Sequence, residues 1–370
     1  MKIPCVVQVA LVQQEGNSLM LYDNILTDFL RQSGDKSDSE RIQRAIDATE
    51  NGILLIPKGD YSIKTPLFIT NRCSLLMHPA ARLIAEEEMD FVLTYKAAGD
   101  YVKPYIYNKD GSVYDNLGLF IEGGDIEGNG KASCLAITNA HHFTLSKTAL
   151  HNGKKYGLYV GGSFGGHIYE LVCSNIYCKC TMKGLAGNVG IWTNQSDAHY
   201  IDCFVVDYTV GMRILGWSNR ITRCHLWGGI VPPKNCSIEE WDKVCGDRTN
   251  ALYGAYALDN DVYENELPEM LENSIAFDII GGSNILDGCY ADTAATGYNI
   301  SGTTRLIGCD FFNNKILGLK EATVINHIKG DLTVSQCSFR STVGTEVLYV
   351  GSKKNLEWTQ NKVIGFKEGI

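Results

Sequence analysis

The sequence contains no long apolar run. Its 370 residues include 38 glycines, and 45% of the residues are hydrophobic, but the apolar ones come in short groups. A membrane span needs about 20 consecutive apolar residues, so we expect no membrane partner. A clear signal peptide is also lacking, since Met1-Lys2-Ile3-Pro4-Cys5 leads only into a short mixed run. We expect a protein of the cytoplasm, or one exported without a recognisable signal peptide.

The 13 cysteines lack the signs of a disulfide framework or a zinc site. Their number is odd, and five of them recur at one position of a repeat, which indicates packing rather than pairing. Cys173, Cys178 and Cys180 are close in the chain but lack the paired spacing of structural zinc ligands. We therefore expect free thiols, no metal, no cofactor, and a reducing compartment or an anaerobic source.

Positive charge is also scarce. The chain has 33 lysines and arginines against 42 aspartates and glutamates, a formal net charge of −9. Such a balance argues against a nucleic-acid partner and mildly against a polyanionic substrate.

A short phrase repeats along residues 117–363: apolar, two residues, cysteine, one residue, apolar. Its five copies are Tyr200-x-x-Cys203-x-Val205, Ile221-x-x-Cys224-x-Leu226, Leu286-x-x-Cys289-x-Ala291, Leu306-x-x-Cys309-x-Phe311 and Val334-x-x-Cys337-x-Phe339. Three further copies, around Thr148, Leu171 and Asn361, replace the cysteine. The copies are mostly 20 to 32 residues apart, a period typical of solenoids.

Each repeat holds three short alternating runs separated by polar or glycine turns, for example Gly211-Met212-Arg213-Ile214, Asn219-Arg220-Ile221 and Cys224-His225-Leu226-Trp227. Strands this short cannot bury a face alone, but coils stacked about 4.8 Å apart share one core. The pattern predicts an all-β protein, a single-stranded right-handed parallel β-helix. We expect an N-terminal segment over residues 1–36, the β-helix over 37–370, and a large loop insertion at about 229–273.

The front end carries three recognisable phrases. Ser37-Asp38-Ser39-Glu40 precedes Ile42, Ala45 and Ile46, as in a short capped amphipathic helix. Pro57-Lys58-Gly59-Asp60-Tyr61 and Gly123-Gly124-Asp125-Ile126-Glu127-Gly128-Asn129-Gly130 follow. This order resembles the pectate-lyase-like, glycoside-hydrolase-28-related right-handed β-helix superfamily over nearly the whole chain. The resemblance implies the pectin-lyase-like fold but no subfamily, because the superfamily includes polygalacturonases, pectate lyases, inulin fructotransferases, epimerases and phage tailspikes.

The sequence departs from polygalacturonases at their catalytic positions. Those enzymes carry Asn-Thr-Asp and Asp-Asp before the first strand of a coil, with Gly-His-Gly nearby. Here the corresponding residues are Asn188-Val189, Thr209-Val210, Ser274-Ile275 and Ala295-Thr296, and the sequence contains no Gly-His-Gly. A polygalacturonase is therefore not expected.

Candidate site residues form a column along the first strands of successive coils. The predicted outward column is Tyr159, Trp192, Arg213, Asp278 and Asn299. The resemblance to pectin-active proteins places the sugar cleft here, and the large insertion enters the Asp278 strand. The insertion holds ten acids and three bases, with Trp241 among its aromatics. Aromatic rings give sugars a flat apolar platform, and paired carboxylates cleave glycosidic bonds.

We assign Asp278 and Asp292 as the best carboxylate pair, with Asp207, Glu266 and Glu269 as alternates. Trp192 would stack on the sugar, Arg213 would bind it or orient a carboxylate, and Tyr159, Asn299 and Trp241 would complete the binding surface. The alternatives are structural: Arg213 and Asp278 as a surface ion pair, Trp192 packed under a loop or at a subunit interface, and the insertion's acids only solvating it.

The third strands offer a rival column of Phe204, His225, Tyr290, Asp310 and Ser338, beside Val206, Trp227, Asp292, Phe312 and Arg340. Its large apolar members fit a homotrimer interface at least as well as a binding site.

Three functions remain open. The first is a carbohydrate-active enzyme that breaks or transfers glycosidic bonds, favouring neutral glycans such as fructans. The second is a polysaccharide lyase in which Arg213 is the base and acids such as Asp278 hold Ca²⁺. The third is a non-catalytic glycan-binding, tailspike-like or structural β-helix protein.

Overall fold

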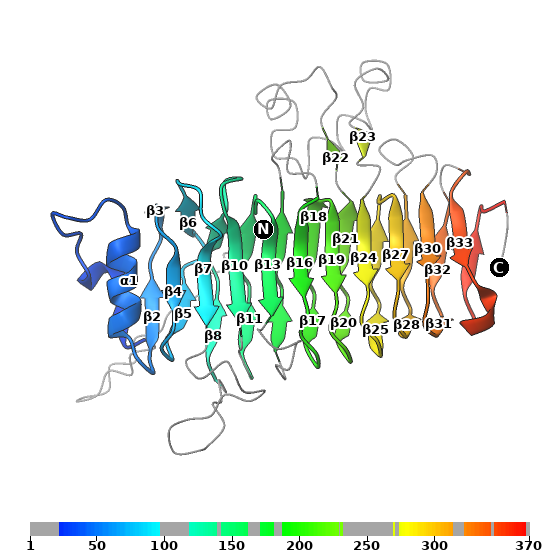
Figure 1. Ribbon diagram of the computed structural model, residues 1–370, viewed down its shortest axis with the longest axis horizontal. Helices are drawn as coiled ribbons and strands as arrows, with labels where there is room; N and C mark the ends of the chain where they lie inside the picture. Colours follow the sequence, from blue (N-terminus) through cyan, green and yellow to red (C-terminus); the bar gives the residue numbers. More distant parts are fainter. Residues whose placement is uncertain are drawn as a thin grey trace, which may run out of the picture.

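The computed structural model describes residues 22–96, 118–138, 142–161, 171–180, 187–228, 230–231, 269–270, 274–313, 322–341 and 344–367. These residues form an elongated stack of coils, each contributing one strand to each of three parallel sheets (Figure 1). Parallel strands joined by such crossovers are right-handed, as the repeat predicts. Both the solenoid and its short N-terminal helix are confirmed.

The first sheet has ten strands and carries the predicted Asp278 column. Its strands are β4 (Leu67–Ile69), β7 (Phe91–Lys96), β10 (Ser133–Thr138), β13 (Tyr156–Gly161), β16 (Val189–Thr193), β19 (Val210–Ile214), β24 (Ile275–Ile279), β27 (Thr296–Ile300), β30 (Thr323–His327) and β33 (Val347–Gly351).

The second sheet has twelve strands, and its pairing begins ahead of residue 37. Its strands are β1 (Asn24–Ile25), β2 (Ile53–Ile56), β5 (Ser74–Met77), β8 (Phe120–Glu122), β11 (Thr144–Ser146), β14 (Val172–Ser174), β17 (His199–Ile201), β20 (Arg220–Thr222), β25 (Asn284–Asp287), β28 (Thr304–Ile307), β31 (Leu332–Ser335) and β34 (Leu356–Thr359).

The third sheet has eleven strands and carries the rival column. Its strands are β3 (Gly59–Ile63), β6 (Ala81–Ala85), β9 (Asp125–Glu127), β12 (Ala149–His151), β15 (Tyr177–Lys179), β18 (Phe204–Tyr208), β21 (His225–Gly228), β26 (Tyr290–Asp292), β29 (Asp310–Phe312), β32 (Ser338–Arg340) and β35 (Lys362–Ile364).

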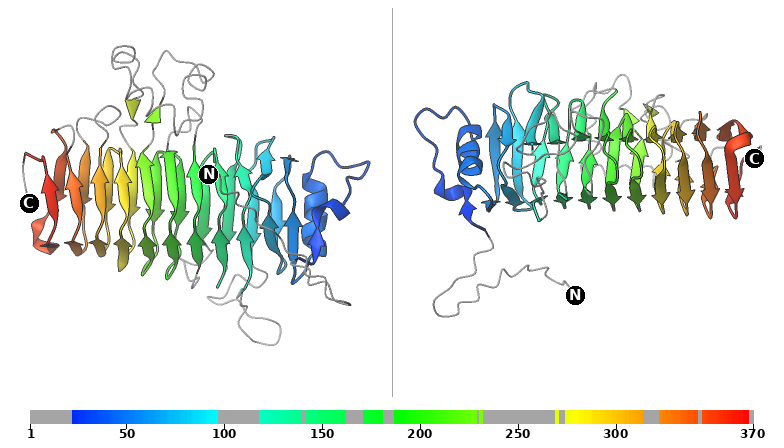
Figure 2. Two further views of the ribbon diagram at one scale, coloured as in Figure 1. Left: turned by 180° about the vertical axis from the view of Figure 1, so that it is seen from behind. Right: turned by 60° about the horizontal axis from the view of Figure 1, so that its bottom comes forward.

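A two-stranded antiparallel pair, β22 (Ile230–Val231) and β23 (Glu269–Met270), lies beyond the edge of the stack near β19 and β24 (Figures 1 and 2). The rest of the predicted insertion at 229–273 lies outside the described residues. Two short 3₁₀ helices, Leu26–Asp28 and Lys353–Asn355, complete the elements. In the described part of the chain, no helix is both long and apolar enough to cross a membrane.

The repeated cysteine follows a sharp turn between the second and third strands. The residue just before it has a left-handed backbone, with φ of 53° at Asp202 and 51° at Arg223. This turn sends the thiol inward, where Cys203, Cys224 and Cys289 are fully buried. Each thiol also contacts a carbonyl of the preceding coil, as in Cys289 Sγ to Ile221 O at 3.2 Å. The ladder thus packs as a column of small apolar groups that are also weak donors.

The five ladder cysteines are expected to react with a thiol reagent only after unfolding. None of Cys203, Cys224, Cys289, Cys309 and Cys337 is in a disulfide, and burial raises the pKa of the Cys224 and Cys309 thiols. The prediction is tested by titrating the thiols, with and without denaturant, with an aromatic disulfide that releases a coloured product on reaction. Each change to serine should cost roughly 1–3 kcal/mol unless the hydroxyl finds a partner. Mass shifts showing disulfides among these five cysteines would contradict the interpretation of a column of free thiols.

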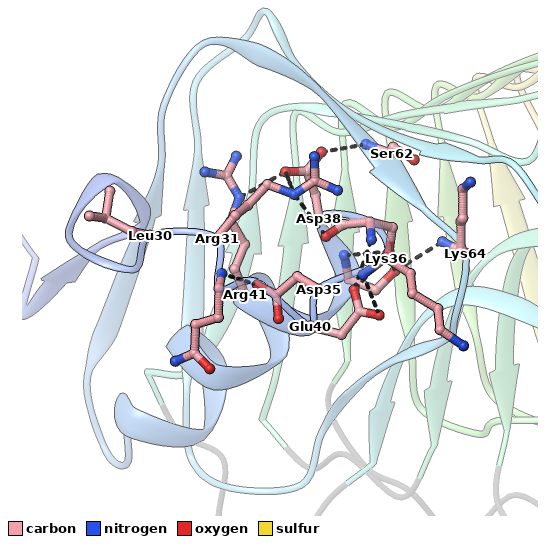
Figure 3. Close-up of polar contacts among 12 residues, drawn as sticks. Leu30, Arg31, Asp35, Lys36, Asp38, Glu40, Arg41, Ser62 and Lys64 are labelled. Atoms are coloured by element: carbon pink, nitrogen blue, oxygen red, sulfur yellow. Dashed lines mark hydrogen bonds and ion pairs between the residues drawn. The ribbon is translucent and has the colours of Figure 1, made fainter.

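Helix α1 (Ser39–Ala48) closes the N-terminal end of the stack (Figure 1). Its apolar face, with Ile42, Ala45 and Ile46, is fully buried. The N-cap residue Asp38 makes no side-chain bond to the helix amides and instead accepts from the Ser62 amide of β3 at 2.9 Å. Figure 3 shows this carboxylate between two arginines and the neighbouring strand, so the cap ties the helix to the first coil.

Acid is expected to weaken a second carboxylate contact of helix α1, the ion pair between Asp35 and Arg44. Two nitrogens of Arg44 hold the carboxylate of Asp35 at 2.8 and 2.7 Å, which lowers its pKa from 3.8 to about 2. A lowered folded-state pKa stabilises the protein above the unfolded pKa, and that stabilisation is lost as the pH falls from near 4 toward 2. Thermal unfolding over this range should show a smaller pH dependence in Asp35→Asn than in the wild type. Equal slopes would contradict the prediction.

Candidate functional site

An aromatic platform covers part of the outer face of the first sheet. Tyr159 in β13 and Trp192 in β16 are register neighbours, and their rings stack in parallel with centroids 4.5 Å apart and planes 4° apart. Tyr156 and Phe91 extend the cluster, with Tyr156 5.3 Å from Tyr159 and Phe91 5.8 Å from Tyr159. These rings are half-buried, and the parallel stack turns one face of Tyr159 and one face of Trp192 toward each other. The cluster therefore presents apolar ring edges and its outer ring faces at the surface of the solenoid.

A ladder of polar side chains continues the same column. Arg213 Nε lies 2.6 Å from Asp278 Oδ2, and Asn299 Nδ2 donates to Asp278 Oδ1 at 2.8 Å. Asn326, which the sequence analysis did not include, donates to Asn299 Oδ1 at 2.8 Å. The strand register places the four residues on consecutive coils, and Trp192 lies one coil before Arg213. Platform and ladder therefore form one continuous surface.

Both carboxylate oxygens of Asp278 are used within this ladder of polar side chains. Its side chain is only 5% exposed, and each carboxylate oxygen already accepts a hydrogen bond. Arg213 is 33% exposed and, within the described residues, only its Nε is bonded. Its terminal N–H groups have no hydrogen-bond partner among the described residues, and such groups suit hydroxyls or a carboxylate of a ligand.

The structure places Asp278 and Asp292 on strands of different sheets. Asp292 ends β26 in the third sheet, whereas Asp278 lies in β24 in the first sheet. The Asp292 carboxylate is buried, accepts from the Thr293 hydroxyl at 2.6 Å and lies 3.3 Å from His225 Nε2. Asp292 is the last residue of its strand, next to the loop that leads into β27 of the first sheet, and its pairing with Asp278 stays a prediction.

The alternates are spread over other parts of the fold. Asp207 lies at an irregularity of β18 in the third sheet, with a left-handed backbone of φ 61°. Glu269 belongs to strand β23, and its assigned role stays a prediction. Glu266 and Trp241 lie outside the described residues, so their assigned roles stay predictions.

A hollow of about 630 Å³ opens beside the aromatic platform, and the sequence analysis missed it. Its lining includes Glu88, Asp90, Phe91, Lys154, Lys155 and Tyr156. The loop leading into β7 and the loop leading into β13 form its walls. Glu88 pairs with Lys154, and the Lys155 ammonium lies 5.1 Å from the centre of the Tyr156 ring. Glu88 to Phe91 precede residue 117, where the cysteine repeat begins, so the repeat could not align these residues with the later coils.

Within the described ranges, no group of three or more histidine, cysteine, aspartate or glutamate side chains is arranged to hold a metal ion. Cys173 and Cys178, part of the weak zinc candidate, point into the core, and burial raises the pKa of both thiols.

Comparison with known proteins gives structural relatives only. No family model matches the chain, and no curated protein matches its sequence. Geobacillus virus E2 ORF18 is similar over 92% of this chain, with 15% identity and a TM-score of 0.56, and the chain spans 59% of its length. The A-module of the Azotobacter vinelandii mannuronan C-5 epimerase AlgE4 is similar over 93% of this chain and 96% of its own, with 12% identity and a TM-score of 0.51.

The chain has the pectate-lyase-like parallel β-helix fold. At these identities the likeness establishes the architecture of the β-helix and leaves its chemistry to the residues on its surface.

On any substrate that binds to Arg213, replacing Asp278 by asparagine is expected to lower the rate by about 10-fold, or about 1.4 kcal/mol, without changing the pH profile. Arg213 and Asn299 donate to different oxygens of Asp278, and asparagine keeps an oxygen at only one of the two positions. The other donor then faces an NH2 group, so the guanidinium is less firmly placed. The free energy of unfolding should fall by about 1–2 kcal/mol.

Kinetics across pH and urea unfolding measure the two effects, with the exposed Asp287→Asn of β25 as the matched control. A loss of 10² to 10⁴-fold with one limb of the pH profile removed would instead make Asp278 a proton-transfer group.

Proposed function

We propose that this protein is a carbohydrate-active enzyme that breaks or transfers glycosidic bonds of a glycan lying along the outer face of the first sheet. The observation that carries the proposal is the parallel Tyr159–Trp192 stack, which continues into the exposed guanidinium of Arg213. Sugars bind to such surfaces by placing their apolar ring faces on aromatic side chains and their hydroxyls on charged donors. The same fold in the mannuronan epimerase module carries a polysaccharide-active site, which supports a glycan as the ligand class.

The carboxylates nearest the platform are those of the hollow. Glu88 and Asp90 are exposed and lie two residues apart, directly before Phe91 of the platform. Asp278 and Asp292 are buried and already hydrogen-bonded, which makes them poorer proton carriers. We therefore assign Glu88 and Asp90 as the first acid and base to test, and Asp278 as the residue that positions Arg213.

The test is a screen of neutral and acidic glycans in which product mass identifies hydrolysis or transfer. On a turned-over glycan, Asp90→Asn or Glu88→Gln should lose about 10² to 10⁴ in rate, the usual contribution of a positioned acid or base. Glu87→Gln is the matched control, because Glu87 is an exposed neighbour that does not line the hollow. Unchanged rates in both variants would remove the hollow from the mechanism.

The same screen separates the alternatives. A product absorbing in the ultraviolet that disappears with a chelator would favour the calcium-dependent lyase. Tight binding without turnover would favour a non-catalytic glycan-binding protein. The preference for neutral glycans, fructans included, rests on the net charge of −9 and is tested by which class is turned over.

A further inference from the structure

A row of aromatic rings crosses five consecutive strands of the third sheet, away from the first-sheet site. Its members are His151, Tyr177, Phe204, His225 and Tyr290, on β12, β15, β18, β21 and β26. Tyr177, Phe204, His225 and Tyr290 are register neighbours in turn. The rings of His225 and Tyr290 stack at 4.5 Å, and those of Phe204 and His225 lie 5.6 Å apart.

Carboxylates fix the histidines of the row. His151 Nδ1 lies 2.9 Å from Asp125 Oδ1, and Arg82 Nε holds the other oxygen of Asp125 at 3.1 Å. His225 Nε2 lies 3.3 Å from Asp292, the buried acid that the sequence analysis assigned to catalysis. The rings of His151 and Tyr177 make an edge-to-face contact, with centroids 5.8 Å apart and planes at 82°. A row held in this way binds with little loss of side-chain freedom.

The composition around the row favours a sugar over a second copy of the chain. Only Phe204, at 45% exposure, is a strongly exposed apolar member, and the other rings are half-buried. Charged residues flank the row on the same face, namely Asp310 and Arg340 at one end and Arg82, Glu127 and Lys179 toward the other. The core of a stable protein interface is depleted of charge, whereas a glycan site alternates ring faces with polar groups.

The geometry also matches an extended chain of sugars. Four strand spacings of about 4.8 Å give the row a length of about 19 Å along the solenoid axis. The charges of both signs around it leave no strong local field, which suits a neutral ligand.

We propose that this row is a second glycan-binding surface, which takes a flat, extended, neutral oligosaccharide independently of the first-sheet site. In this arrangement Asp125 and Asp292 position His151 and His225, Phe204 supplies the exposed ring, and Tyr290 supports the row by stacking on His225. The proposal explains why Asp292 is buried against a histidine of the third sheet.

Calorimetric titration of the full chain with cellohexaose, a flat neutral hexaose, tests the proposal. The titration is made in the Trp192→Ala background, so that binding at the first-sheet site is weakened and the two sites separate in affinity. We expect about one hexaose per chain in this background and at least a tenfold loss of affinity on adding Phe204→Ala or Tyr290→Ala. Phe68→Ala is the matched control, because Phe68 is also 45% exposed but lies in the first sheet on β4.

No binding of cellohexaose in the Trp192→Ala background, or binding unchanged by Phe204→Ala, would overturn the proposal. So would tighter binding of hexagalacturonic acid than of cellohexaose, which would make the surface an anion site. A trimer mass by light scattering that Phe204→Ala reduces to a monomer, with glycan binding intact, would make the row a subunit interface instead. Each result is independent of turnover at the first-sheet site, so the two proposals can fail separately.

Discussion

Replacing Gly281 by alanine is expected to lower the free energy of unfolding by about 3 kcal/mol, because the new methyl group would clash with backbone atoms of the preceding coil. A Cβ at Gly281 would lie 1.9 Å from the Gly216 carbonyl oxygen and 2.5 Å from that of Leu215. Gly302 meets Gly281 O in the same way at 2.1 Å, so glycines stack at this turn in successive coils. Neither coil can move aside, since strand pairing fixes their spacing.

Gly282→Ala provides the matched control. The nearest atoms to a Cβ there are ring atoms of Trp217 at 3.3 and 3.4 Å, and Trp217 is 62% exposed and can shift. We expect a change within about 0.5 kcal/mol, because the added methyl group meets an exposed side chain and no backbone atom. Urea unfolding of both variants measures the difference, and equal stabilities would contradict the stacked-glycine account.

The repeat phrase predicted the fold and most of the surface columns correctly. Because side chains alternate with a period of two, fixing one cysteine fixes which neighbours face outward. The observed register accordingly pairs Tyr159 with Trp192, Trp192 with Arg213, and Arg213 with Asp278. The ion-pair interpretation of Arg213 and Asp278 is confirmed at 2.6 Å.

The repeat could not predict what each polar side chain would contact. The sequence suggests Asp292 as a partner of Asp278, whereas its contact with His225 depends on side-chain packing within the third sheet. Glu88 and Asp90 were missed because their hollow is formed by two loops that are distant in the sequence and outside the cysteine-containing coils. Sequence periodicity therefore located strands and faces, whereas the carboxylates suited to chemistry required the three-dimensional arrangement of loops.

Replacing Trp192 by alanine is expected to reduce glycan affinity at the first-sheet site by about 10- to 100-fold. The indole supplies the face nearest Arg213 and is held parallel to Tyr159 at 4.5 Å, so its removal deletes stacking area and leaves Tyr159 without its partner. Loss of a large apolar contact is worth roughly 1.5–3 kcal/mol, and each 1.4 kcal/mol is about tenfold in affinity.

Binding should be measured by calorimetry on a glycan that the screen shows to be turned over, with Trp217→Ala as the matched control. Trp217 is an exposed tryptophan in the turn between β19 and β20, outside the aromatic platform. We expect Trp217→Ala to bind and turn over the glycan like the wild type. If Trp192→Ala kept full affinity while Trp217→Ala lost it, the glycan would lie over the turn rather than along the first sheet. The ladder from Arg213 to Asn326 would then be a structural stack of hydrogen bonds and not part of the site.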